Sequence, residues 1–124
     1  MSQHRSKSVV LEVLEKIALL FPKFDMPSEP KRLQAVVNAW SYALGKYVYP
    51  DNIWLEAVDE FYSRSDSWGA APLPGDILEC ARVVMERAER DPVRGPKVRA
   101  WREARQDERD RLIREQRSRR EAAN

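Results

Sequence analysis

The sequence has few of the residues from which disulfides and metal sites are built. Among its 124 residues there is one cysteine, Cys80, and one histidine, His4, and only four glycines are present. A single cysteine cannot form an internal disulfide, and a zinc site of cysteine and histidine ligands needs several such residues. We therefore expect no metal site, no bound cofactor and no need for an oxidising compartment.

Long hydrophobic runs are also missing. No apolar stretch approaches the roughly 20 residues that cross a bilayer. The polar N-terminus is not followed by the apolar core of a signal peptide, because Glu12, Glu15 and Lys16 interrupt it. We expect a soluble, intracellular protein without a membrane partner.

Charge is plentiful, and it is unevenly distributed. Charged residues make up 34% of the chain, with a net charge of +2, whereas an average domain has roughly 25%. Residues 1–91 contain 11 basic and 14 acidic residues, while residues 92–124 contain 11 basic and 6 acidic residues. The boundary segment Asp91-Pro92-Val93-Arg94-Gly95-Pro96 has the Pro and Gly content of a linker. The composition predicts a helical body over residues 1–91, and then a linker with a basic, Arg-rich tail over residues 92–124.

Apolar residues in the body recur at helical spacing, and residues that cap or end helices divide it into four segments. These residues are Pro22, Ser28 with Pro30, Gly45, Asp51 and Pro72-Leu73-Pro74-Gly75. We expect Ser28 to cap the second helix. The expected core anchors are Phe21, Trp40, Trp54 and Phe61, with Tyr62 on the same inner side of the third helix. The predicted fold class is all-α, a small four-helix body followed by a charged, Arg-rich C-terminal helix or conditional helix.

The tail favours helix but has little apolar surface to hold it in place. No Pro or Gly occurs from Lys97 to Ala122. Pairs such as Asp107 with Arg111 have the favourable acid-first i,i+4 order, which is worth about 0.2–0.5 kcal/mol each. A helix that is polar nearly all round either lies in solvent or forms against a partner. We expect this helix to be frayed or conditional in the free protein.

This tail is also the main candidate for a functional site. The expected partner-binding residues are Val98, Arg99, Trp101, Arg102, Arg105, Arg109, Leu112 and Ile113. Trp101 would be the apolar anchor in a partner's groove, unless it docks back on the body. The guanidinium fork suits both carboxylates and phosphates, so a protein partner, a nucleic acid and a merely solvated helix stay open. Trp68, in a polar loop, is either a second contact or packs on the neighbouring Ala70-Ala71-Pro72.

Little in the chain indicates catalysis. There is no Ser/His/Asp set and no Gly-rich phosphate loop. Glu56, Asp59 and Glu60 lie close together on the third helix, where carboxylates could bind a cation or transfer protons, but an exposed helix face accounts for them better. Cys80 adjoins the apolar face of the fourth helix and is expected to be a small buried residue rather than a nucleophile. We expect that the protein is not an enzyme.

Four groups of landmarks follow one another through roughly residues 9–88. They are Leu20-Phe21-Pro22-Lys23-Phe24, Trp40 with Leu44, Ala57 with Tyr62, and Pro72-Leu73-Pro74-Gly75-Asp76-Ile77. In this order they resemble the N-terminal helical domain of phage replicative helicase loader/inhibitor proteins. The chain departs from that family at Pro74-Gly75, where a Thr and small or apolar residues are more usual, and in its Arg-rich tail.

The resemblance implies a non-enzymatic adaptor of phage DNA replication, in the cytoplasm of a bacterial host. Such a protein binds a DnaB-type helicase, a hexameric ring, through its C-terminal part. It restrains the helicase and then delivers it to an origin-binding initiator or onto single-stranded DNA. Two alternatives stay open from the residues alone, namely a small nucleic-acid-binding regulator with its tail on phosphates and a phage inhibitor of another host protein.

Overall fold

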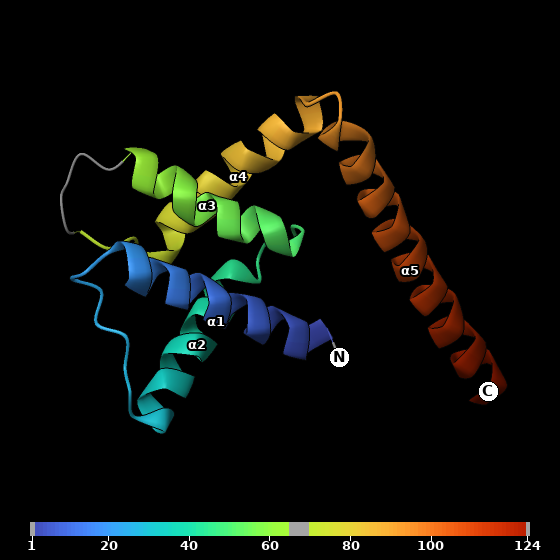
Figure 1. Ribbon diagram of the computed structural model, residues 1–124. Helices are drawn as coiled ribbons and strands as arrows, with labels where there is room; N and C mark the ends of the chain where they lie inside the picture. The colour runs from blue at the N-terminus through green and yellow to red at the C-terminus, as the bar shows by residue number, and fades with distance from the viewer. Residues whose placement is uncertain (1, 65–69, 124) are drawn as a thin grey trace. The chain divides into compact units, whose positions relative to one another are not determined.

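Figure 1 shows the fold in a computed structural model that describes residues 2–64 and 70–123, with side chains from Val9 onward. The helices are α1 (Ser2–Leu20), α2 (Pro30–Leu44), α3 (Asp51–Arg64), α4 (Pro74–Arg90) and α5 (Arg94–Ala123). No strand occurs within the described ranges. The predicted all-α fold class is therefore confirmed.

The chain divides into two compact units, Met1–Glu86 and Arg87–Asn124. The division falls inside α4, so the last turn of this helix belongs with α5. The composition of the sequence changes after Asp91, about one turn further along the chain.

One apolar face of each of the first four helices contributes to the core of the first unit. Helix α1 packs against α2 and α3 and lies beside α3 in Figure 1. Leu14 and Ile17 on α1 are 0% exposed. The other buried apolar side chains of this unit are Val9, Val10, Val13, Phe21, Val37, Trp40, Leu44, Ile53, Trp54, Ala57, Val58, Ile77, Cys80, Ala81, Val84 and Met85. Fully burying one large aliphatic or aromatic side chain contributes about 1.5–3 kcal/mol, so burial on this scale is the main source of stability of the unit.

Three of the four predicted aromatic core anchors are buried, whereas Phe61 and its neighbour Tyr62 are not. Phe21, Trp40 and Trp54 are buried, but Phe61 is only half-buried and Tyr62 is 50% exposed. The ring of Phe21 lies 5.7 Å from that of Phe61 and meets Tyr62 edge-on at 5.6 Å. Tyr62 was wrongly expected to face inward, since it lies about a third of a turn from the centre of the buried face of α3.

The position of the proline, rather than the type of residue available as a cap, determines where α2 begins. Pro30 is the first residue of α2, so the cap is the residue directly before it, and that residue is Glu29 rather than the predicted Ser28. The Glu29 carboxylate accepts hydrogen bonds from the backbone N–H groups of Lys31 and Arg32, both at 3.1 Å.

Helix α4 also begins at a proline, Pro74, within the Pro-rich segment that predicted it. The Asp76 carboxylate accepts a hydrogen bond from the backbone N–H of Leu73 at 2.8 Å. This reach back from the first turn is half of a capping box, and it satisfies a donor at the helix start that has no intrahelical partner.

Candidate functional site on the C-terminal helix

Helix α5 begins at a tight turn that Asp91 organises. The backbone N–H of Asp91 donates to the carbonyl of Arg87, which closes α4. Its carboxylate accepts from the N–H groups of Arg94 at 2.9 Å and Val93 at 2.8 Å. These two hydrogen bonds hold the pKa of Asp91 below its ordinary value. Asp91 thus caps the turn that leads into α5.

Gly95 and Pro96 lie inside the first turn of α5, although the sequence placed them in a linker. Gly95 is buried, and a Cβ at this position would stand 2.7 Å from the carbonyl oxygen of Glu89, closer than real Cβ contacts allow. The glycine is therefore needed for the approach of the α5 start to the last turn of α4. An ion pair between Glu89 and Arg102 supports the same approach.

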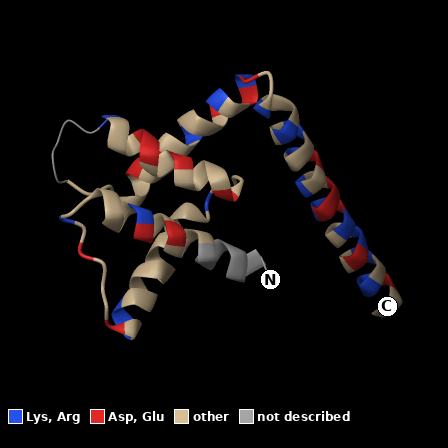
Figure 2. Ribbon diagram, in the orientation of Figure 1, with Lys and Arg blue, Asp and Glu red and all other residues tan. Residues whose placement is uncertain are grey.

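Beyond this turn α5 is a 30-residue helix whose larger part faces solvent. Every residue from Arg102 to Ala123 is exposed. Helix α5 is continuous in the structure. That it is frayed or conditional in the free protein stays a prediction. The helix carries both signs of charge along its length (Figure 2).

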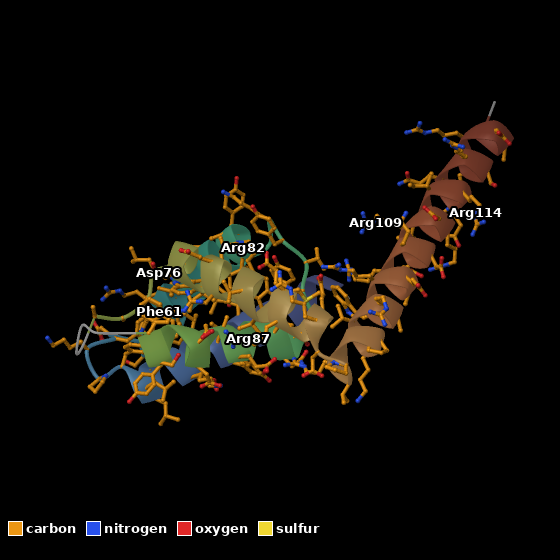
Figure 3. The ribbon with its side chains drawn as sticks, turned by 90° about the horizontal axis from the view of Figure 1, so that it is seen from above. Phe61, Asp76, Arg82, Arg87, Arg109 and Arg114 are labelled. Atoms are coloured by element: carbon orange, nitrogen blue, oxygen red, sulfur yellow. The ribbon has the colours of Figure 1, made fainter. Side chains whose placement is uncertain are left out.

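The charges of α5 are sorted around the helix axis. At about 100° per residue, one face collects apolar and basic side chains and one glutamine, at spacings of three or four residues. We call it the arginine face, and it consists of Arg102, Arg105, Arg109, Leu112, Ile113, Gln116 and Arg120. By the same spacing, all six acidic residues of α5 lie about 90° or more from the centre of this face. Figure 3 shows that Arg109 and Arg114 point to opposite sides of the helix.

One arginine outside this face is neutralised along the helix itself. Arg111 donates to Glu108 at 2.6 Å and 3.1 Å and to Glu115 at 2.8 Å. Hydrogen bonds from Arg111 hold the pKa of Glu108 below its ordinary value, and Glu108 in turn raises the pKa of Arg111. The predicted partner of Arg111 was Asp107, and the structure instead selects Glu108 and Glu115.

The residues predicted to bind a partner divide into three groups by exposure. Val98 is buried at 6% exposure, so it offers no free surface. Trp101 is half-buried, and the guanidinium of Arg105 lies over its ring at 5.5 Å. The exposed members are Arg99, Arg102, Arg105, Arg109, Leu112 and Ile113. Trp68, the expected second contact, lies outside the described residues.

The exposed apolar part of the candidate surface therefore lies further along α5 than the sequence suggested. Leu112 is 47% exposed and Ile113 is 48% exposed, in the middle of the arginine face. Trp101, which we expected to be the main anchor, has the guanidinium of Arg105 over its ring.

The carboxylates of α3 are engaged in structural contacts. Lys16 on α1 donates to Asp59 at 2.7 Å and to the carbonyl of Leu55 at 3.2 Å, which ties α1 to α3. Glu60 pairs with Arg64 at 3.7 Å. Within the described ranges, no group of three or more His, Cys, Asp or Glu side chains could hold a metal ion.

Cys80 is buried, as the sequence predicted. Burial raises the pKa of its thiol, and the nearby charge of Arg64 opposes that rise only in part. A raised pKa leaves little thiolate near neutral pH, and the thiolate is the nucleophilic form.

Sequence reasoning missed several exposed aromatic and apolar side chains on the first unit. Tyr42 is 80% exposed, Tyr47 56% and Val48 52%. The ring of Tyr47 stacks on Tyr49 at 6.4 Å, and Tyr49 tilts against the buried Trp54 at 5.3 Å. The run Tyr47-Val48-Tyr49 could have indicated this exposure. It lies between α2 and α3, outside any helix that would turn its side chains toward the core.

Neither a membrane-spanning helix in the described part of the chain nor a relative among known proteins was found. No helix among the described residues is long and apolar enough to span a bilayer. The chain matches no protein-family model, no curated protein and no solved structure.

Proposed function

We propose that the protein is a phage-type DNA replication adaptor that binds a DnaB-type replicative helicase of its bacterial host through α5, restrains it and later loads it onto DNA. The observation that carries this proposal is the exposed arginine face of α5, which leaves Leu112 and Ile113 in solvent. A partner that binds a helix in a groove buries apolar side chains of this kind. The order of landmarks in the body, from Phe21 to Ile77, supports the choice of helicase as the partner.

The energetics of α5 suit a partner that must later be released. Exposed ion pairs such as Arg111 with Glu115 contribute little to holding the helix. Part of the contact energy with a partner is therefore spent on ordering α5, which lowers the affinity for a given contact area. Modest affinity allows a loader to dissociate once the helicase is engaged on DNA.

A second candidate function is direct binding to nucleic acid. It is favoured by one observation, the absence of acidic residues from the arginine face. Phosphate contacts by arginine would make the affinity fall steeply and log-linearly with salt, without any protein partner.

A pull-down with the purified replicative helicase tests the proposal. The full chain and a chain ending after Ala104 are compared, since the shorter chain keeps the Asp91 turn and the Glu89–Arg102 ion pair. Urea unfolding of both chains checks that the first unit is intact in each. We expect the full chain to bind and the shorter chain not to bind.

Equal binding by both chains would refute the role of α5. Absence of binding by the full chain would refute the helicase as the partner, and capture of another host protein by the full chain alone would then favour an inhibitor of that protein.

A further inference from the structure

The middle of the arginine face joins two kinds of recognition chemistry. Leu112 and Ile113 are side by side and half exposed. Arg109 precedes them by about one turn and Arg120 follows them by about two turns, on the same side of the helix. A surface that binds this region must therefore bury an apolar pair and supply negative charge at both ends of it.

A nucleic acid meets only half of this requirement. Phosphates would pair with Arg109 and Arg120, but a phosphate backbone offers Leu112 and Ile113 no apolar surface. The flanks of the face add to the mismatch, because Glu108 lies on one side of it and would approach the phosphates of a groove.

An anionic membrane also fits poorly. A helix that lies in the membrane interface needs a broad apolar face. The exposed part of the arginine face has two adjacent aliphatic residues, Leu112 and Ile113, with arginines before and after them.

We infer that the arginine face docks on an acidic protein surface, with Leu112 and Ile113 in an apolar pocket and carboxylates of the partner around Arg105, Arg109 and Arg120. Charge complementarity selects this occupant, since such a surface satisfies both the guanidinium groups and the apolar pair. The acidic residues on the far side of α5, such as Asp107, would be repelled by the same carboxylates, which fixes the side by which the helix docks. The inference rests on the proposed function in taking a protein as the partner, and it adds the chemistry of that partner's site.

Helix α5 offers a closely matched pair of substitutions for the test. Arg109 and Arg114 are both exposed arginines of the same helix, and they point to opposite sides of it (Figure 3). Arg109→Glu and Arg114→Glu change the net charge by the same amount. A general electrostatic attraction would respond equally to both, whereas docking through the arginine face responds to Arg109→Glu alone. Leu112→Ser in the full chain tests the apolar pocket separately.

The probe is a synthetic amphipathic helical peptide with a leucine stripe bordered by glutamates, titrated into the isotopically labelled full chain and followed by amide chemical shifts. We expect shifts centred on residues 105–120. We expect Arg109→Glu and Leu112→Ser each to weaken binding by about tenfold, the scale of one contact at the centre of an interface. Arg114→Glu should change it by less than about twofold, because that side chain lies off the contact surface.

Three further probes define the outcomes that overturn the inference. They are the same peptide with lysine in place of glutamate, a 20-base-pair DNA duplex and vesicles of anionic phospholipid. Tighter binding to any of these than to the acidic peptide would overturn it, as would no binding of the acidic peptide at millimolar concentration. Equal effects of Arg109→Glu and Arg114→Glu would also overturn it.

The same variants separate this inference from the proposed function when they are used with the purified helicase. Binding of the helicase that is lost equally with Arg109→Glu and Arg114→Glu would sink the inference and leave the adaptor role standing. Binding of the acidic peptide without binding of the helicase would sink the adaptor role and leave the docking chemistry standing.

Discussion

Replacing Leu14 with alanine tests whether α1 is the centre of the first unit. Leu14 is 0% exposed, so the substitution removes buried methyl groups and leaves a cavity. Changes of this kind cost about 2–5 kcal/mol, while a unit of 86 residues has a total stability of about 4–13 kcal/mol. Taking the middle of each range, we expect the substitution to remove a third or more of the free energy of unfolding.

Leu19→Ala is the matched control, since Leu19 lies on the same helix and is 83% exposed. Its effect on the free energy of unfolding should stay within about 0.5 kcal/mol. Both variants are unfolded in urea and followed by the fluorescence of the buried Trp40 and Trp54. A cost for Leu14→Ala below about 1 kcal/mol, or an equal cost for the two leucines, would refute this description of the core.

Three further predictions concern the α4–α5 turn and the buried thiol. Helix propensity alone favours alanine over glycine by about 1 kcal/mol, but Gly95→Ala should lower the melting temperature of α5 followed by circular dichroism, because its Cβ meets the Glu89 carbonyl; a rise would contradict the close approach. The Cys80 thiol should react with a disulfide reagent at pH 8 only as fast as the protein opens, since it is buried with a raised pKa, and rapid reaction of the folded protein would be inconsistent with this. The pKa of Asp91 is lowered in the folded state, so its stabilisation of α5 is present above the ordinary aspartate pKa and is lost as the pH falls through the lowered value. The protection factor of the Arg94 amide, which is corrected for the intrinsic exchange rate at each pH, should therefore fall on acidification in the wild type and show no such step in Asp91→Asn, and a step of equal size in both would refute the cap.

Much of the fold follows from local pattern. The spacing of Val10, Leu14 and Ile17 places one face of α1 inward, and these side chains are all buried. Pro74 marks the start of α4 because its ring tolerates only the first turn of a helix. Ser28 and Tyr62 were misplaced for different reasons: the cap is fixed by where Pro30 falls in the helix, and the inward face of a helix end depends on which neighbours pack there.

The candidate site was less predictable. The sequence identified α5 and its arginines, but it treated Val98 and Leu112 alike as apolar contacts beside the anchor Trp101, whereas the structure buries Val98 and leaves Leu112 in solvent. Exposure of this kind is decided by tertiary packing rather than by the residue's own neighbours in sequence. Gly95 is a second example. Its neighbours in sequence indicate a helix breaker, but the structure requires a glycine there because the Glu89 carbonyl lies too close for a Cβ.

We propose that the outer part of α5 is stabilised by a partner rather than by the rest of its own chain. Hydrogen exchange of the full chain, measured alone and with the purified replicative helicase, tests it most directly. We predict that residues 105–123 exchange much faster than Val13–Ile17 in the free protein, because a solvated helix without tertiary contacts is only marginally stable, and that they slow markedly in the complex. Protection of residues 105–123 in the free protein equal to that of Val13–Ile17, unchanged by the helicase, would contradict the account.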